Sequence, residues 1–414
     1  EGWACHENER TVPRGRTMIP LVLGGALLLA CALLWISGAK VIRPGPPEAA
    51  APGAGNLPRA GLVVPAAGRS PALSSAALSL LSQDYPSYEV VFVTRDPEDP
   101  AAAVIREVVD GRPGARLVFA GPASQCGQKN HNLLRGLDAL GDGPEILVFC
   151  DGTRTAPAGW LRALVAPLIR GEFEVTSGYH HVLPADARLP TLGHAMSVLV
   201  LYLTKGVPFL NQPWGGGTAI RRRTFERMGV RDVWARNVVD DVSLAALLKK
   251  NRVAVGASPG AWVLTPLAGE SVGSWTRWLF RQWFYLKVCL PGSWLAAGAA
   301  CHLLALGLLA SVAGASLGTA GLLPVSWTVA SWFVLCLAAG FAIALRSLLP
   351  GAIPLIPWLA AVPMTAGAAS WSHLRTLFTM EVEWREIRYR VRWSGAVKAV
   401  KGKTGGPGSA SGVH

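Results

Sequence analysis

Closely spaced cysteine pairs are absent from this chain of 414 residues. Its seven cysteines contain no CxxC pair and several fall inside apolar runs, so neither a zinc site nor a disulfide framework is predicted. Thiols in such surroundings behave as small hydrophobic side chains and stay reduced in a cytosolic environment. The positions are Cys5, Cys31, Cys126, Cys150, Cys289, Cys301 and Cys336.

Charged residues are also scarce, at 16% of the chain against 51% apolar residues, although the formal net charge is +13. This composition is too apolar for an ordinary soluble protein. No basic patch interleaved with aromatic residues is present, so a nucleic-acid partner is not expected. Many arginines and lysines instead flank apolar runs, which suits anionic lipid headgroups and the positive-inside bias of membrane proteins.

The N-terminal part of the chain predicts a membrane anchor. Residues 1–17 form a polar tail, and residues 18–38 contain an uncharged apolar run of about 20 residues, the length needed to cross a bilayer. The run is long for a signal peptide and no small-x-small cleavage site follows it, so an anchor is favoured. Residues 39–60 are rich in Pro, Ala and Gly and are typical of a linker.

The C-terminal part predicts two to three membrane helices over residues 288–372. Residues 288–345 contain no Asp, Glu, Lys or Arg, which accommodates two crossings with a turn near residues 314–321. Residues 347–372 are uncharged but broken by four prolines, and either a kinked crossing or an interfacial segment fits them. Two crossings would leave the basic cytosolic or flexible tail, residues 373–414, in the cytosol, whereas three would place it outside.

Between these regions, residues 61–270 alternate strand-like and helix-like segments. Tight alternation of this kind predicts βαβ units and a mainly parallel sheet, hence an α/β fold. Such sheets bind ligands at the carboxyl ends of their strands. The predicted strands are residues 62–65, 89–94, 116–120 and 145–150, and the predicted helices are residues 73–83, 101–109 and 129–140.

Acidic residues occur at three points where predicted strands or loops end. Asp96 and Asp99 follow the second strand, Asp151 follows the fourth, and Asp240 and Asp241 precede an apolar helix. A carboxylate at a strand end is costly to desolvate unless it is paired or binds a cation or a sugar hydroxyl. A single one would be explained by helix N-capping. Three such points in one domain favour a binding site.

An ordered set of motifs surrounds these acids. The set resembles the inverting family-2 glycosyltransferases, and most closely the ceramide glucosyltransferase branch. The resemblance covers residues 61–287 and implies a GT-A (Rossmann-like) nucleotide-sugar-binding domain with transmembrane α-helices. The motifs are QDYP at 83–86, YEV at 88–90, FVTRD at 92–96, DPA at 99–101, KNHNL at 129–133, CDG at 150–152, GGG at 215–217, RR at 221–222, DD at 240–241 and RW at 277–278.

The resemblance implies an inverting reaction in which Asp241, with Asp240 beside it, acts as the general base. Inversion needs one carboxylate to take the proton of the acceptor hydroxyl as its oxygen attacks the anomeric carbon. Asp151 would bind the Mg²⁺ or Mn²⁺ ion that bridges the diphosphate, since oxygen ligands suit these cations. The leaving UDP gains negative charge, which the cation and an arginine would stabilise.

The same resemblance assigns nucleotide-sugar-binding positions. Asp99, with Asp96 beside it, would hold the uracil or the ribose of a UDP-sugar donor. Lys129 lies where family members place a basic residue near the nucleotide. Gly215 and Gly216 would allow close approach of the backbone to a sugar or a phosphate.

Arg277 and Trp278 occupy the last two positions of a (Q/R)xxRW motif and would hold the diphosphate and close the site. They lie in a Trp- and Arg-rich segment, residues 271–287, that predicts an interfacial helix with indoles at headgroup depth. A shorter apolar segment, residues 196–203, is either a core helix or a membrane-surface helix at the acceptor's entrance. His180 and His181 are expected to be exposed polar residues.

Three departures from the family pattern stand out. Thr153 replaces the second carboxylate of a DxD metal motif, and Ser274 replaces the first residue of (Q/R)xxRW. Val198 and Leu199 stand where the animal ceramide enzymes carry a His-Pro pair. The first two bear on metal and diphosphate binding, and the third weakens ceramide as the acceptor.

The expected function is therefore transfer of a sugar, glucose first among candidates, from a UDP-sugar to the hydroxyl of a ceramide-like or other membrane lipid. A hopanoid or other bacterial lipid N-acetylglucosaminyltransferase is the rival within this class, and a processive polysaccharide synthase is the second enzymatic reading. A membrane scaffold or a transporter is the alternative from another class. The expected location is the bilayer, with a cytosolic catalytic domain and a bacterial inner membrane as the setting.

Overall fold

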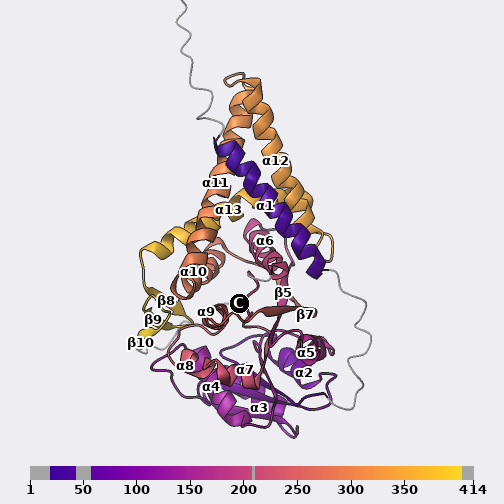
Figure 1. Ribbon diagram of the computed structural model, residues 1–414, viewed down its shortest axis with the longest axis vertical. Helices are drawn as coiled ribbons and strands as arrows, with labels where there is room; N and C mark the ends of the chain where they lie inside the picture. The colour runs from indigo at the N-terminus through magenta and orange to yellow at the C-terminus, as the bar shows by residue number, and fades with distance from the viewer. Residues whose placement is uncertain (1–18, 43–56, 208–209, 403–414) are drawn as a thin grey trace, which may run out of the picture.

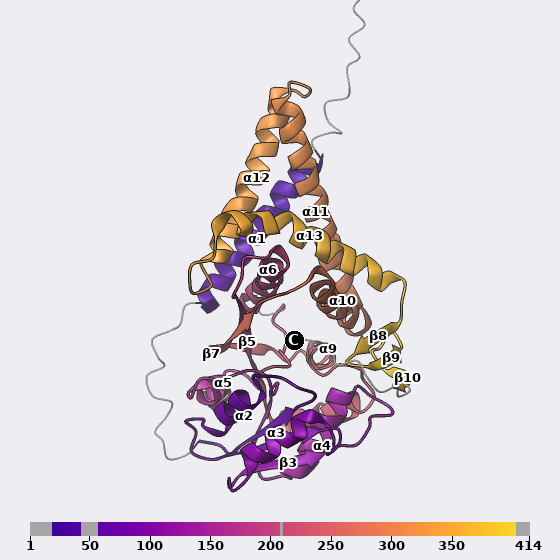
Figure 2. The same cartoon turned by 180° about the vertical axis from the view of Figure 1, so that it is seen from behind.

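The computed structural model describes residues 19–42, 57–207 and 210–402. The polar tail predicted at residues 1–17 and most of the predicted linker lie outside the described residues. A sheet domain occupies one end of the molecule, a narrow bundle of helices occupies the other, and α6 and α10 lie between them (Figure 1). Figure 2 shows the same three-part arrangement from behind.

A seven-stranded mixed sheet forms the centre of the sheet domain, in the order β3-β2-β1-β4-β6-β5-β7. The first four strands pair in parallel, β6 runs antiparallel to both neighbours, and β5 pairs in parallel with β7. The α/β prediction is confirmed. The strands are β1 (Ala60–Pro65), β2 (Tyr88–Thr94), β3 (Ala115–Phe119), β4 (Ile146–Phe149), β5 (Val175–Pro184), β6 (Thr218–Arg221) and β7 (Val255–Leu267).

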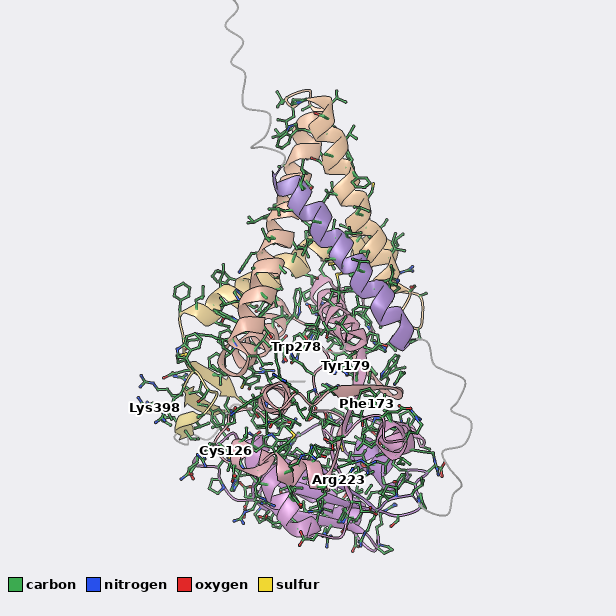
Figure 3. All side chains as sticks on the ribbon, viewed as in Figure 1. Cys126, Phe173, Tyr179, Arg223, Trp278 and Lys398 are labelled. Atoms are coloured by element: carbon green, nitrogen blue, oxygen red, sulfur yellow. The ribbon has the colours of Figure 1, made fainter. Side chains whose placement is uncertain are left out.

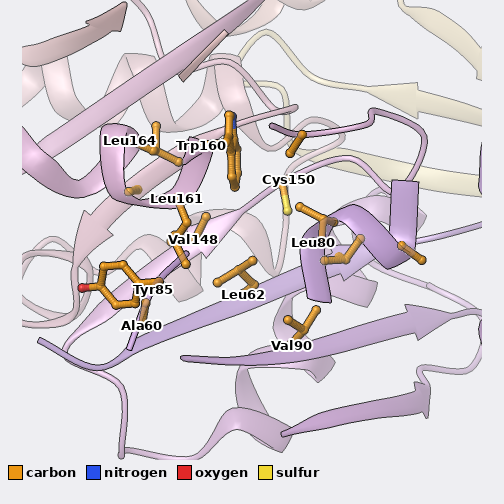
Figure 4. Close-up of a cluster of buried hydrophobic side chains, with 14 of the residues drawn as sticks. Ala60, Leu62, Leu80, Tyr85, Val90, Val148, Cys150, Trp160, Leu161 and Leu164 are labelled. Carbon is orange, nitrogen blue, oxygen red and sulfur yellow. The ribbon is translucent and has the colours of Figure 1, made fainter. Parts of the chain in front are cut away.

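Helices cover both faces of this sheet, so its central strands are buried on both sides and read as continuous apolar runs. Successive β1 residues point to opposite faces: Leu62 and Val64 belong to one core cluster and Val63 to the other. Figure 4 shows the first cluster, with Trp160 and Leu62 facing each other across it. The helices are α2 (Leu73–Leu81), α3 (Pro100–Val109), α4 (Gln128–Leu140), α5 (Trp160–Ile169), α7 (Arg222–Arg227), α8 (Val230–Trp234) and α9 (Asp241–Lys250).

Two helices of the bundle, α11 (Pro291–Thr319) and α12 (Val325–Arg346), are long and apolar enough to cross a membrane. Most of their side chains face outwards, as lipid-facing residues would. The turn between them lies at residues 320–324, slightly later than expected. Beside them pack α1 (Ile19–Ile42), whose apolar part is shorter, and α13 (Leu355–Leu377), which contains Pro363.

The layer between the sheet and the bundle consists of α6 (Leu189–Leu203), the short 3₁₀ helix η1 (Thr204–Gly206) and α10 (Val272–Cys289). Most of α6 is buried, since it packs on β5 from one side and on α13 from the other. Of the two readings of this segment, the structure has the core helix. The predicted Trp- and Arg-rich helix is present as α10.

The chain does not end as a simple tail after α13. Residues 381–402 fold into a three-stranded antiparallel sheet of β8 (Glu381–Trp384), β9 (Ile387–Val391) and β10 (Val397–Gly402). Its inner face buries Val382 and Tyr389 against Val238 of the sheet domain and Phe284 of α10. This C-terminal sheet therefore lies against the same region as α9 (Figure 1).

Candidate active site

A lysine held between two carboxylates lies at the centre of the site. The Nζ atom of Lys129, in the first turn of α4, is 3.0 Å from Asp151 Oδ1 and 3.0 Å from Asp240 Oδ2. Burial alone would lower the pKa of Lys129, but Asp151, Asp240 and Asp241 together raise it above its ordinary value. Lys129 is thus a permanent cation at the carboxyl end of β4, where the sequence placed a site.

Asp241 begins α9 beside this cluster, and main-chain amides fix its orientation. Gly215 N donates to Oδ2 at 3.1 Å, and Val242 N donates to Oδ1 at 2.7 Å. Burial, and next the charge of Asp240, raises the pKa of Asp241 from 3.8 to about 6, although Lys129 opposes the rise. A carboxylate with such a pKa is a stronger base than an exposed one and is ionised at neutral pH.

The glycines of the turn after Trp214 are required by close approach. A Cβ atom on Gly215 would lie 2.6 Å from Lys129 Nζ, and one on Gly216 would lie 2.2 Å from the Trp214 ring. The carbonyl of Gly215 also accepts from Lys129 at 3.3 Å. Any side chain here would therefore displace either the lysine or the indole.

The predicted nucleotide-binding acids lie at the end of β2 and have other partners as well. Asp99 caps α3, accepting from Ala101 N at 2.9 Å, and its Oδ1 also accepts from Gly68 N at 2.7 Å. Asp99 is therefore the N-cap residue of α3, and its side chain also connects the β1–α2 loop to that helix. Asp96 instead pairs with its neighbour Arg95 at 2.6 Å.

Arg277 and Trp278, near the start of α10, are not in contact with the carboxylate cluster. Trp278 packs against the His194 ring at 4.4 Å between centroids, and Figure 3 labels it at the junction of the helices and the sheet domain. His194 Nδ1 in turn pairs with Glu270 at 2.8 Å. Arg277 is exposed and, over the described ranges, has no hydrogen-bond or ion-pair partner. Ser274, the departure from the motif, forms a capping box with Ser271.

Several site residues were missed by sequence reasoning. The expectation that His180 and His181 are exposed was wrong, because both are buried in β5, and the His180 ring stacks on Trp214 at 4.9 Å and an interplanar angle of 3°. Lys205 is buried beneath this stack with its Nζ 5.1 Å from the centre of the Tyr179 ring. Burial lowers the pKa of Lys205 to about 7, although the charge of Asp241 opposes the shift. No signal in the sequence pointed to these residues, because no strand was predicted at positions 175–184.

The donor set around Asp151 limits how a divalent cation could bind. Thr153 supplies no carboxylate, and the described residues contain no group of three or more His, Cys, Asp or Glu placed to hold a metal. Mg²⁺ is commonly bound by one or two carboxylates together with substrate phosphates. The residues present therefore fit a cation that is held jointly by Asp151 and a phosphorylated ligand.

A glycosyltransferase of GT-A fold is the class that this sheet and its strand-end carboxylates define. The sequence model of glycosyl transferase family 21 matches residues 22–397, so the chain belongs to that family. The family match confirms the resemblance to the ceramide glucosyltransferase branch. No curated protein matches the chain.

The solved structures that match the chain include two glycosyltransferases. A mannosyltransferase from Pyrobaculum calidifontis, in complex with GDP-Man and Mn²⁺, has 19% identity and a TM-score of 0.54, covering 86% of this chain and 98% of its own. GalNAc-T7 with UDP, GalNAc and Mn²⁺ has 13% identity and a TM-score of 0.40, covering 57% of this chain and 48% of its own. At this identity the first likeness shows the fold alone.

Proposed function

We propose that this glycosyltransferase moves a sugar, glucose in the first instance, from a UDP-sugar to the hydroxyl of a membrane lipid with inversion at the anomeric carbon. The observation that carries the proposal is Asp241. It is held by two amides, its pKa is raised to about 6, and it lies beside the Lys129 cluster at the strand ends. A positioned base beside the place where the donor sugar binds is what a single-displacement transfer needs.

In the reaction, the acceptor oxygen attacks the anomeric carbon while its proton passes to the carboxylate of Asp241. The bond from that carbon to the diphosphate oxygen breaks, and the electron pair leaves with UDP. Lys129 would hold the carboxylates of Asp151 and Asp240 in fixed positions around the site. Because the lysine is already in place between Asp151 and Asp240, little reorganisation accompanies the step.

A divalent cation, Mg²⁺ or Mn²⁺, would be held by Asp151 together with the diphosphate oxygens. When bound, it would supply Lewis-acid stabilisation of the departing diphosphate. The Mn²⁺ bound to the mannosyltransferase of similar fold supports a divalent cation, and Asp151 as its ligand is part of the proposal.

The donor's other contacts follow from the remaining positions. Asp99 and Asp96, at the end of β2, would face the uracil or the ribose. The turn at Gly215 and Gly216 would let the sugar approach the backbone, since neither residue has a side chain. Arg277, which is exposed and unpaired among the described residues, would close on the diphosphate together with Trp278 when the donor binds.

A lipid acceptor is favoured by where the site lies. The layer of α6 and α10 separates the sheet domain from a bundle containing two helices that could cross a membrane (Figures 1 and 2). Trp278 and Trp283 of α10 are half-buried and suit the headgroup region, whereas Trp275 is fully buried. A hydroxyl carried on a lipid headgroup would thus meet the domain at this layer, with the catalytic domain in the cytosol.

The test is transfer from radiolabelled UDP-sugars to a lipid extract by the full chain in membranes, compared with Asp241→Asn and with Asp232→Asn. Asp232 is an exposed acid on α8 and serves as the matched control. We expect one labelled sugar per lipid from wild type and from the control, and loss of at least 100-fold with Asp241→Asn. Equal transfer by Asp241→Asn would refute the base assignment. Long labelled polymer would instead indicate a polysaccharide synthase, and no transfer from any donor a scaffold.

A further inference from the structure

The hairpin of the C-terminal sheet carries an arginine into the candidate nucleotide site. The sheet is attached by hydrogen bonds to the segments that hold the cluster: Gln128 N donates to Tyr389 Oη at 3.1 Å, and Val238 N donates to Gly395 O at 3.0 Å. Gln128 precedes Lys129, and Val238 lies shortly before Asp240. The position of the hairpin is therefore tied to the catalytic residues.

Arg385 occupies the tip of this hairpin. Trp384 pairs with Ile387, so Arg385 and Glu386 form a two-residue turn, and Arg385 has a φ of +48°. Turns with positive φ at the first central position strongly prefer glycine. An arginine in this place has an unfavourable backbone conformation, and such residues persist mainly where the side chain is needed.

The guanidinium of Arg385 lies over the β1–α2 loop. Its Nη1 donates to Ala67 O at 2.5 Å, and a Cβ on Gly68 would lie 2.5 Å from the same nitrogen. Gly68 is the residue whose amide binds Asp99. Burial lowers the pKa of Arg385, while the charges of Asp99 and Asp151 both act to raise it.

Within the described ranges, however, Arg385 forms no ion pair. Of its five N–H donors, only one makes a hydrogen bond there, to the main-chain carbonyl of Ala67. A second guanidinium, that of Arg154, has its Nε buried without a hydrogen-bond partner, and the charge of Asp151 acts to raise its pKa against the effect of burial. The exposed side chain of Arg385 keeps donors free for a ligand, and Arg154 offers a buried donor. A planar guanidinium is well suited to phosphate oxygens.

We propose that Arg385 binds the diphosphate of the nucleotide donor, so that the C-terminal sheet completes a site begun by the sheet domain. This rests on the proposed use of a nucleotide-sugar. If Arg385 served only to hold the hairpin on the β1–α2 loop, replacing it would lower Tm. The ratio of the affinities for UDP and uridine would then stay unchanged.

Arg385→Gly separates these readings, because glycine suits the turn while removing the guanidinium. The purified full chain, in detergent with Mg²⁺, is titrated with UDP, uridine and pyrophosphate, alongside Arg385→Lys and Arg388→Ala. Arg388, on β9, pairs with Glu383 and is the matched control. We expect Arg385→Gly to weaken UDP and pyrophosphate binding at least 10-fold with uridine unchanged and Tm equal or higher. Arg385→Lys should fall in between, and Arg388→Ala should match wild type.

Unchanged UDP affinity in Arg385→Gly, or equal weakening for UDP and uridine, would overturn the assignment while leaving the transferase proposal intact. A lowered Tm with an unchanged UDP-to-uridine ratio would make Arg385 a fastening residue only. If wild type does not bind UDP, the proposed use of a UDP-sugar itself fails.

Discussion

The sharpest consequence of the structure is the pH dependence of Asp241. Its pKa is about 6, raised first by burial and then by Asp240. Transfer requires the ionised carboxylate, so activity should be lost as the pH falls through about 6. A single group with this pKa is roughly nine-tenths ionised at pH 7 and one-tenth at pH 5, which gives an approximately tenfold fall in kcat/KM. An unperturbed aspartate would lose almost nothing over this range.

Stability should vary in the opposite sense. The pKa of Asp241 in the folded protein is above its unfolded value of 3.8, so protonated Asp241 favours the folded state. This contribution to the free energy of unfolding is complete below pH 3.8 and is lost as the pH rises through about 6. The cost of holding Asp241 ionised above that pH is at most roughly 3 kcal/mol. Asp241→Asn removes the charge, so its Tm relative to wild type should be higher at pH 7.5 than at pH 5.

The assay is initial transfer rate to lipid from pH 5 to pH 8, with thermal unfolding measured on the same samples. Asp232→Asn should reproduce the wild-type profile, because that side chain is exposed on α8. A wild-type profile that is flat between pH 5 and pH 7, or one that Asp241→Asn preserves at normal rate, would refute the reasoning.

Three further predictions concern the same site. Lys129→Met should move the acid limb of the pH profile to higher pH, because Lys129 lowers the pKa of Asp241; an unchanged midpoint would contradict this. Mn²⁺ should bind tightly only when UDP is present, and Asp151→Asn should abolish that binding in spectroscopic titrations; equal binding without nucleotide would argue for a complete protein site. Gly216→Ala should destabilise the protein by about 1–3 kcal/mol through overpacking, whereas Gly159→Ala, whose Cβ meets nothing within 4 Å, should leave Tm unchanged.

The parts of the fold that could be predicted from the sequence are those with local signals. Alternating strand and helix patterns located β1 to β4 to within about two residues, because apolar runs bounded by turn residues specify buried strands. Asp151 and Asp241 stood out because each followed a strand or preceded a helix. The structure brings Asp151, Asp240 and Asp241 together around Lys129, and their catalytic roles stay predictions.

What the sequence did not reveal depends on contacts between distant segments. The hairpin of β8 and β9 has a readable signature, since Val382, Trp384, Ile387, Tyr389 and Val391 alternate with polar residues around a two-residue turn. Its many arginines made the segment look like a solvated tail. That the tip of the hairpin contacts the β1–α2 loop follows only from long-range packing, and no local pattern encodes it.

The helix α10, in the layer between the sheet domain and the helix bundle, packs near Asp241. Cys289 of α10 lies close enough to Asp241 that burial and, to a lesser degree, the carboxylate's charge raise the pKa of its thiol to about 12. Lys287, also on α10, connects this helix to the end of α13, because its Nζ donates to Thr376 O at 2.6 Å and to Thr379 O at 3.0 Å. Burial is the main cause of the raised pKa of Asp241, and α10 packs against α9, the helix that begins with this residue.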